Sequence, residues 1–366
     1  PQYHIPLRLV GSEMCIRDRS PLTPEQLETL DPEWRKRLEC LVDRARDDAS
    51  NLKDDPDVAH WAQVFSLSPD QGSLRQWCIQ RGLLDPHQPR ALHGSVWSGT
   101  FAKELEHEAQ RLISSAAQPH PGDDDRLDLC HLATYTLDDT GTREIDDAVS
   151  LDVQNGEVWI WVHIADPARL ISPGSPLDQE ARRRATSLYL ADGVLPMLPL
   201  GLAAGPLSLR AGQRTAAISV SVRLDSAGAI ADRRIARSWV RPRYGLTYAD
   251  GDELIELAPP GDETLADLSQ LMQLRSRWRR QQGALMFDRM EGRFRRSDGA
   301  LSLQLVEPSP ARLMVSEAML LMGAVVAEFG CQHELALPFR SQPPAELPSQ
   351  AELDQLPEGA ARDAAI

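Results

Sequence analysis

The stretch DDTGTREIDDAVSLDVQNGEVWIWVHIAD, residues 138–166, joins a run of carboxylates to a strand–turn–strand pattern. Asn155-Gly156 stands between two apolar runs, which is the strongest short-range signal for a β-hairpin. The second run, 158–164, alternates aliphatic side chains on one face with two tryptophans and His163 on the other. A period of two is the spacing of a β-strand. The stretch therefore predicts a sheet that begins next to an acidic segment.

The periodicity of the chain changes on either side of residue 128. Residues 20–128 show mostly helical spacing, and the polar stretch His120–Arg126 (HPGDDDR) breaks that pattern. Strands with inserted helices follow. We therefore expect an α+β protein with a helical region over 20–128 and a mixed α/β domain over 129–366.

Four further elements are predicted within the second region. Alternation over 217–224 predicts a half-buried strand, and Ser175 is expected to cap a helix that runs through Arg184. The other two are an amphipathic helix over Thr264–Gln282 and an apolar core helix over Ala311–Phe329, ended by Gly330.

The first nineteen residues do not fit either region. Leu9–Arg19 (LVGSEMCIRDR) resembles an in-frame translation of a sequencing adapter, and Pro1–Arg19 lacks the apolar core of a signal peptide. We therefore expect residues 1–19 to be non-native and leave them out of functional reasoning.

Charge and cysteine content restrict the class of protein. The formal net charge of −15 argues against a module that simply coats nucleic acid, because such modules are usually basic. Five cysteines without paired spacing indicate a reducing compartment, so we expect a cytoplasmic protein without disulfide partners. An organellar precursor that has lost its transit peptide is the alternative. No apolar run approaches the roughly 18 residues needed to cross a bilayer, so we expect no membrane partner.

The acidic run 138–147 is the main chemical signal. Carboxylates placed this close repel one another and need a compensating cation if they are desolvated. Oxygen-rich sites select hard ions such as Mg²⁺. In an extended strand Asp146 and Asp147 point to opposite faces, so they serve one ion only if the chain bends. Taken alone, the run also fits an acidic surface turn.

A family resemblance resolves that choice. The pattern Asp138-x5-Glu144-Ile145-Asp146-Asp147-Ala148 resembles the acidic signature of the ribonuclease II / ribonuclease R family, whose catalytic module is the RNB domain. The segments that follow in the family's order are His163–Asp166, Pro173–Asp178, Ala185–Leu190, Leu195–Pro199, Leu207–Arg210, Gly283–Asp288 and Ser316–Leu320. The resemblance covers about residues 130–345.

The resemblance implies a Mg²⁺-dependent hydrolase that shortens single-stranded RNA from its 3′ end and releases nucleoside 5′-monophosphates. It implies that Asp138, Glu144, Asp146 and Asp147 are the catalytic residues that hold Mg²⁺ and the attacking water. Tyr189 and Phe287 match the aromatics that clamp the last bases, although each also fits a core position. For Glu317 two roles are open, which are contact with the terminal sugar and an ion pair with an arginine.

The chain departs from the family pattern in three places. Glu144 stands where aspartate is more frequent, and Ser316 replaces the first of two acids. The arginine-containing TSPIRRY-like segment and the basic S1-type domain are absent from the sequence. We therefore expect a catalytic domain truncated at its C-terminus and a 366-residue chain that is a poor enzyme.

Three other functions compete with the nuclease. The first is a catalytically impaired relative that only binds RNA. The second is a metal-dependent phosphoesterase for a small substrate, and the third is a helical interaction protein whose acidic run is surface decoration. Retention of all four acidic positions favours the nuclease, because a pure RNA-binding protein has no need of them.

Overall fold

The computed structural model describes residues 28–29, 31–46, 67–68, 70–85, 92, 100–191, 193–286, 290–297, 300–341, 348–353 and 355–356. The chain forms two compact units, Pro1–Gly99 and Thr100–Ile366. The division falls earlier than the predicted boundary at 128/129. The reason is that α6 (Lys103–Ser115) packs in the second unit, where its apolar side joins a cluster with α7 (Pro176–Arg184) and α8 (Leu200–Ala203).

The described part of the first unit is helical, as its spacing predicts. It contains α3 (Pro32–Arg46) and α5 (Gln71–Gln80), whose apolar faces pack together around Leu41, Ala45 and Cys78. The side chain of Asp70 accepts a hydrogen bond from the Ser73 N–H at 2.9 Å, which satisfies a free donor in the first turn of α5.

A mixed seven-stranded sheet is the centre of the second unit. Its strands lie in the order β1-β8-β7-β4-β3-β2-β9. The strands are β1 (Leu127–Asp128), β2 (Thr134–Asp138), β3 (Asp147–Gln154), β4 (Glu157–Ala165), β7 (Thr215–Leu224), β8 (Ile230–Val240) and β9 (Tyr244–Thr247). The β1–β8 and β2–β9 pairs are parallel and the other pairs are antiparallel. The mixed α/β architecture agrees with the expected fold class.

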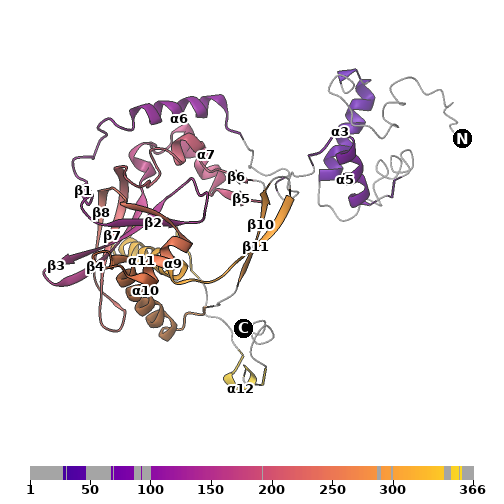
Figure 1. Ribbon diagram of the computed structural model, residues 1–366. Coiled ribbons are helices and arrows are strands. Elements are labelled where there is room, and N and C mark those ends of the chain that lie inside the picture. The colour runs from indigo at the N-terminus through magenta and orange to yellow at the C-terminus, as the bar shows by residue number, and fades with distance from the viewer. Residues whose placement is uncertain are drawn as a thin grey trace, which may run out of the picture. The chain divides into compact units, whose positions relative to one another are not determined.

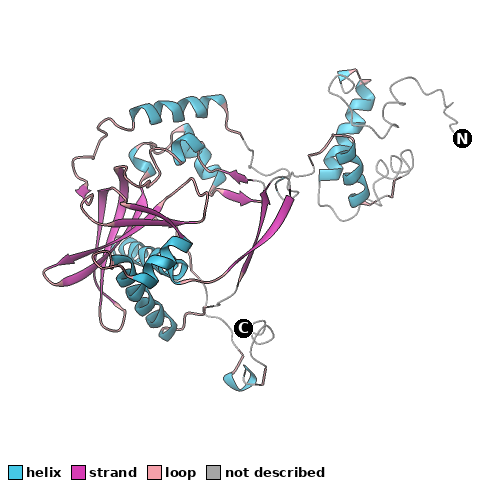
Figure 2. Ribbon diagram, viewed as in Figure 1, coloured by secondary structure: helices cyan, strands magenta, loops and turns pink. Residues whose placement is uncertain are grey.

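Helices lie on both sides of this sheet (Figure 1, Figure 2). On one side are α9 (Tyr248–Leu257), α10 (Thr264–Gln281) and α11 (Pro310–Gln332), and on the other are α6, α7 (Pro176–Arg184) and α8 (Leu200–Ala203). The remaining elements are the 3-10 turn η3 (Pro167–Arg169), the hairpins β5 (Leu188–Leu190) with β6 (Gly193–Leu195) and β10 (Glu291–Ser297) with β11 (Ala300–Val306), and α12 (Gln350–Leu353).

Burial on both faces of the central strands corrects one prediction. The 217–224 strand was expected to be half-buried, yet Ala217, Ser219 and Ser221 are as inaccessible as Val220 and Val222 between them. Val220 and Val222 pack under α10 and α11 on one face, and on the other face Ala217 lies in a cluster with Leu129, Leu132 and Leu209. Both faces of the strand are therefore covered.

The apolar helix also differs from its predicted end. Among the described residues, α11 is the helix that is long and apolar enough to cross a bilayer. Its side chains Met314, Ala318 and Leu321 instead lie in the buried core of this unit. The helix continues through Gly330 to Gln332. A Cβ at residue 330 would stand 2.6 Å from Cδ1 of Leu337. Gly330 therefore does not end the helix, contrary to the prediction, and its missing side chain leaves room for Leu337.

Candidate active site

The four predicted acidic residues lie at one edge of the sheet. Asp138 ends β2 and Asp147 begins β3, and these two strands are antiparallel neighbours. The end of one strand therefore meets the start of the next at the same edge. Glu144 and Asp146 lie in the connection between them. Because Asp146 precedes β3, its side chain does not have to point to the sheet face opposite to that of Asp147.

Backbone contacts hold this connection against the sheet. The Ile145 N–H donates to Ser208 Oγ at 3.1 Å, and the Ile145 carbonyl accepts the Leu209 N–H at 2.7 Å. The Asp146 carbonyl accepts the Ala165 N–H at 2.8 Å. Three hydrogen bonds from distant parts of the chain thus fix the backbone on which the acidic side chains stand.

Glu144 has one satisfied and one unsatisfied oxygen. Ser187 Oγ donates to Glu144 Oε2 at 3.1 Å and accepts the Met197 N–H at 3.0 Å. Glu144 Oε1 is buried and has no hydrogen-bond partner within the described residues. A buried carboxylate oxygen without a partner is unfavourable unless a cation or a donor reaches it.

Burial raises the pKa values of all four carboxyls, and repulsion by neighbouring carboxylates adds to it at Asp138, Glu144 and Asp147. Burial, followed by the charges of Asp146 and Asp139, raises the pKa of Asp138 to about 6. Burial, followed by the charges of Asp146 and Asp138, raises the pKa of Asp147 to about 7. Desolvation also raises the pKa values of Glu144 and Asp146, although the Asp146 side chain remains exposed at the surface.

The site lacks a compensating cation in the described part of the protein. Asp138, Asp146 and Asp147 form no ion pair with any described residue. As the side chains stand, no three His, Cys, Asp or Glu groups among the described residues come close enough to hold a metal ion. The pKa effects nevertheless place Asp138, Asp146 and Asp147 within electrostatic reach of one another. An all-oxygen donor set with an unpartnered buried oxygen fits a hard divalent cation.

Asp139 differs from its neighbours because it is neutralised within the protein. Its Oδ1 accepts a hydrogen bond from Arg312 Nη2 at 2.5 Å, and its Oδ2 pairs with Arg293 Nη1. Burial opposes ionisation of Asp139, but the two guanidinium groups hold its pKa below the usual range. Asp139 belongs to the acidic run of the sequence, but nothing in the sequence indicated its two arginine partners.

Tyr189 stands beside the acidic residues with its ring open to solvent. Its side chain is 67% exposed, on β5. Burial of the hydroxyl, followed by the charges of Glu144, Asp146 and Asp138, raises its pKa. An exposed ring next to an acidic site suits base stacking and excludes the core role. Phe287 lies outside the described residues.

Glu317 contacts α10. Its side chain is 1% exposed, and Oε1 pairs with Arg279 Nη1 at 2.6 Å. Of the two roles left open for Glu317, the ion pair with an arginine is formed, and contact with a sugar stays a prediction.

His163 belongs to the sheet interior. Its ring nitrogens lie 2.9 Å from Ser150 Oγ and 2.7 Å from Ser219 Oγ, and Ser219 contacts Ser238. Burial lowers the pKa of His163 to about 3, so the ring is neutral. This polar row links β3, β4, β7 and β8 and has a structural role.

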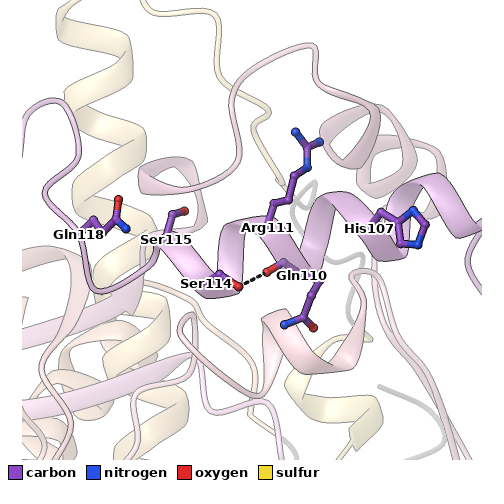
Figure 3. A pocket seen from close by; sticks show the side chains of 6 residues that line it. All are labelled: His107, Gln110, Arg111, Ser114, Ser115 and Gln118. Carbon is purple, nitrogen blue, oxygen red and sulfur yellow. Dashed lines mark hydrogen bonds between the residues drawn. The ribbon is translucent and has the colours of Figure 1, made fainter.

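A separate groove of about 430 Å³ runs along α6 (Figure 3). Its lining residues are His107, Gln110, Arg111, Ser114, Ser115 and Gln118. Arg111 and Gln110 point to different sides of the helix, and Ser114 bonds the Gln110 carbonyl at 2.9 Å. None of these residues belongs to the acidic site.

Comparison with known families accounts for this arrangement. The family model described as the RNB domain matches residues 126–364. The chain belongs to the RNB family. The RNB match begins close to the predicted start of the mixed domain at residue 129, whereas the compact unit also includes α6.

Two curated relatives are similar over most of this chain. An uncharacterized ribonuclease of Synechocystis sp. is 41% identical over 290 residues, which are 79% of this chain and 43% of the relative. The chloroplastic/mitochondrial ribonuclease II of Arabidopsis thaliana is 42% identical over 248 residues, which are 66% of this chain and 31% of the relative. The chain thus spans less than half the length of these RNB proteins.

Solved structures share the fold. Ribonuclease R of Mycoplasma genitalium, in complex with ribose-methylated single-stranded RNA, matches with a TM-score of 0.62 and 21% identity, over 71% of this chain and 41% of that chain. The Dss1 exoribonuclease of Candida glabrata, an active-site mutant, matches with a TM-score of 0.67 and 18% identity, over 88% of this chain and 43% of that chain.

Proposed function

We propose that the protein containing this chain is a Mg²⁺-dependent exoribonuclease that degrades single-stranded RNA from the 3′ end to nucleoside 5′-monophosphates. Membership of the RNB family supports RNA degradation. The observation that carries the proposal is the group formed by Asp138, Glu144, Asp146 and Asp147, whose pKa values are all raised and for which the described residues supply no cation.

In this proposal the four carboxylates hold Mg²⁺ at the sheet edge. When bound, the ion polarises the phosphoryl oxygen and makes bound water more acidic. Ser187 orients Glu144 through the bond to Oε2, and the bonds to Ile145 and Asp146 keep the connection in place. The exposed Tyr189 ring stacks on a base near the 3′ end, which is a contact that suits any sequence.

The test uses the full-length gene product and 5′-labelled single-stranded RNA, with Mg²⁺ or EDTA. The expected result is a ladder that shortens from the 3′ end, with nucleoside 5′-monophosphates as product. EDTA and Asp147→Asn should each abolish it. The matched control is Asp152→Asn, on the same strand. The Asp152 carboxylate accepts a hydrogen bond of 2.7 Å from Gln154 and lies further along the strand from the acidic group.

The same assay separates the competing functions. RNA that is bound but never shortened would support a catalytically impaired RNA-binding protein. Cleavage in EDTA at the normal rate would overturn the metal role. Equal degradation of duplex and single-stranded RNA would contradict the single-strand preference. A cytoplasmic location stays a prediction, to be checked by fractionation.

A further inference from the structure

Two arginines converge on the carboxylate that follows Asp138. Arg293 comes from β10 and Arg312 from the first turn of α11, which are separated from Asp139 by 154 and 173 residues. Each guanidinium contacts a different oxygen of Asp139. Asp139 therefore acts as an anion bound between two positively charged forks.

The pair of arginines borders the acidic group. Asp139 is the next residue to Asp138, and the Arg312 guanidinium carbon lies 4.1 Å from the centre of the Tyr248 ring. The charges of Asp147 and Asp138, after burial, raise the pKa of Tyr248 to about 12, so this ring is also near the acids. Arg312 thus lies in the same region as Asp138 and Asp147.

Structural need alone does not explain these ion pairs. The side chains of Asp139, Arg293 and Arg312 are 26%, 39% and 26% exposed. Ion pairs that reach solvent contribute little to stability. Meanwhile an acidic protein with a carboxylate-lined site repels RNA phosphates, and guanidinium forks are well suited to bind phosphate oxygens in pairs.

We propose that Arg293 and Arg312 bind a backbone phosphate of RNA beside the acidic group, and that Asp139 holds both guanidiniums in the RNA-free protein and is displaced by that phosphate. The proposal rests on the proposed function, because it assumes RNA at this site. It deepens that function by naming residues that position the substrate.

Opposite effects of the two kinds of substitution test this exchange. We would measure the affinity of the full-length gene product for fluorescent single-stranded RNA in EDTA, over a series of salt concentrations. Arg312→Ala and Arg293→Ala should each weaken binding about tenfold or more. Each should also reduce the slope of log affinity against log salt concentration by about 1, the value for one lost phosphate contact. Asp139→Asn should tighten binding several-fold, since it removes the competing charge.

Two controls keep the result interpretable. Arg237→Ala removes a surface arginine that pairs with Asp125 at 3.3 Å, away from the acidic residues, and should leave RNA affinity unchanged. Arg312→Lys keeps the charge but not the fork and should fall between wild type and Arg312→Ala. Circular dichroism of each variant checks folding.

The outcomes separate this proposal from the nuclease. If the wild type cleaves RNA but the arginine variants bind it normally, the arginine pair has only a structural role and the exchange is wrong. Weaker binding in both the arginine and the Asp139 variants also contradicts displacement. If binding follows the prediction but no variant, the wild type included, cleaves RNA, the phosphate site stands and the nuclease function fails.

Discussion

Ser187 and Glu144 are joined by a hydrogen bond of 3.1 Å, although 43 residues separate them in the chain. Ser187 Oγ also accepts a hydrogen bond from the Met197 N–H, so one hydroxyl joins the acidic segment between β2 and β3 to the loop that follows β6. This serine lies in the Ala185–Leu190 segment of the family pattern. The bond offers a reason for a serine at this place.

Replacing Ser187 with alanine should misplace Glu144. The change leaves the Met197 N–H and one Glu144 oxygen without their partner, which should cost about 1 kcal/mol of stability and lower kcat of RNA hydrolysis. Ser221→Ala is the matched control, because the Ser221 hydroxyl is buried without a partner among the described residues. Unchanged kcat in Ser187→Ala would show that Glu144 is held by other contacts.

The raised pKa values predict that stability without metal depends on pH. Asp138 and Asp147 keep their protons in the folded protein up to about pH 6 and 7, whereas the unfolded chain releases them near the ordinary aspartate pKa of 3.8. The folded state therefore binds more protons, and the free energy of unfolding falls as pH rises from about 4 to about 7. Above that window these two groups cause no further loss.

Urea unfolding in EDTA at several pH values measures this slope. Asp147→Asn should reduce the slope and be more stable than wild type at pH 8 by about 1 kcal/mol or more. Asp152→Asn should keep the wild-type slope. Saturating Mg²⁺ should stabilise the wild type more than Asp147→Asn, by mass action. A wild-type stability that rises steadily over pH 4–7 would contradict the raised pKa values.

Tyr189 should matter for RNA and hardly at all for folding. Because its ring is exposed, Tyr189→Ala should change stability by no more than about 0.5 kcal/mol. Loss of stacking should weaken binding of single-stranded RNA by about 1–3 kcal/mol, and Tyr189→Phe should retain it. Val194, its partner across the β5–β6 hairpin, provides the control Val194→Ala. An equal loss in the two alanine variants would point to the hairpin and not to the ring.

The ion pair between Arg279 and Glu317 should be important for stability. Arg279→Ala leaves a carboxylate buried without its partner, which should cost about 3–5 kcal/mol. Arg182→Ala, which breaks a pair of 3.0 Å with Asp178 at the surface, should cost less than about 1 kcal/mol. Thermal unfolding of both variants compares them. Similar small losses would show that water reaches Glu317 in solution.

Much of the local structure was predictable because its signals are local. The Asn155-Gly156 turn lies between β3 and β4, and Ser175 caps α7 as expected. Helical spacing located α10 to within a residue of its end. The acidic residues at the sheet edge are also close in sequence, so their motif named them before any fold was known.

Other features could not be predicted because they depend on contacts between distant residues. Alternation over 217–224 does not tell whether the polar face meets water or is covered. Here Leu129, Leu132 and Leu209 pack on that face beside Ala217. Gly330 resembles a helix end, yet α11 continues to Gln332 and the Leu337 side chain lies where a Cβ of residue 330 would stand. The compact unit begins at Thr100, before the predicted start of the mixed domain, because α6 packs against α7 and α8.

The amino-acid sequence by itself indicated the family, the β3–β4 hairpin, several helices and the acidic run, since each is encoded in short motifs and periodicities. Only the tertiary structure decided which carboxylates stay unneutralised and which find a partner. Asp139 meets Arg293 and Arg312, and Glu317 meets Arg279, whereas Asp147 meets no cation in the described chain. Charge pairing acts through space over a few ångströms, and spacing along the chain does not specify it.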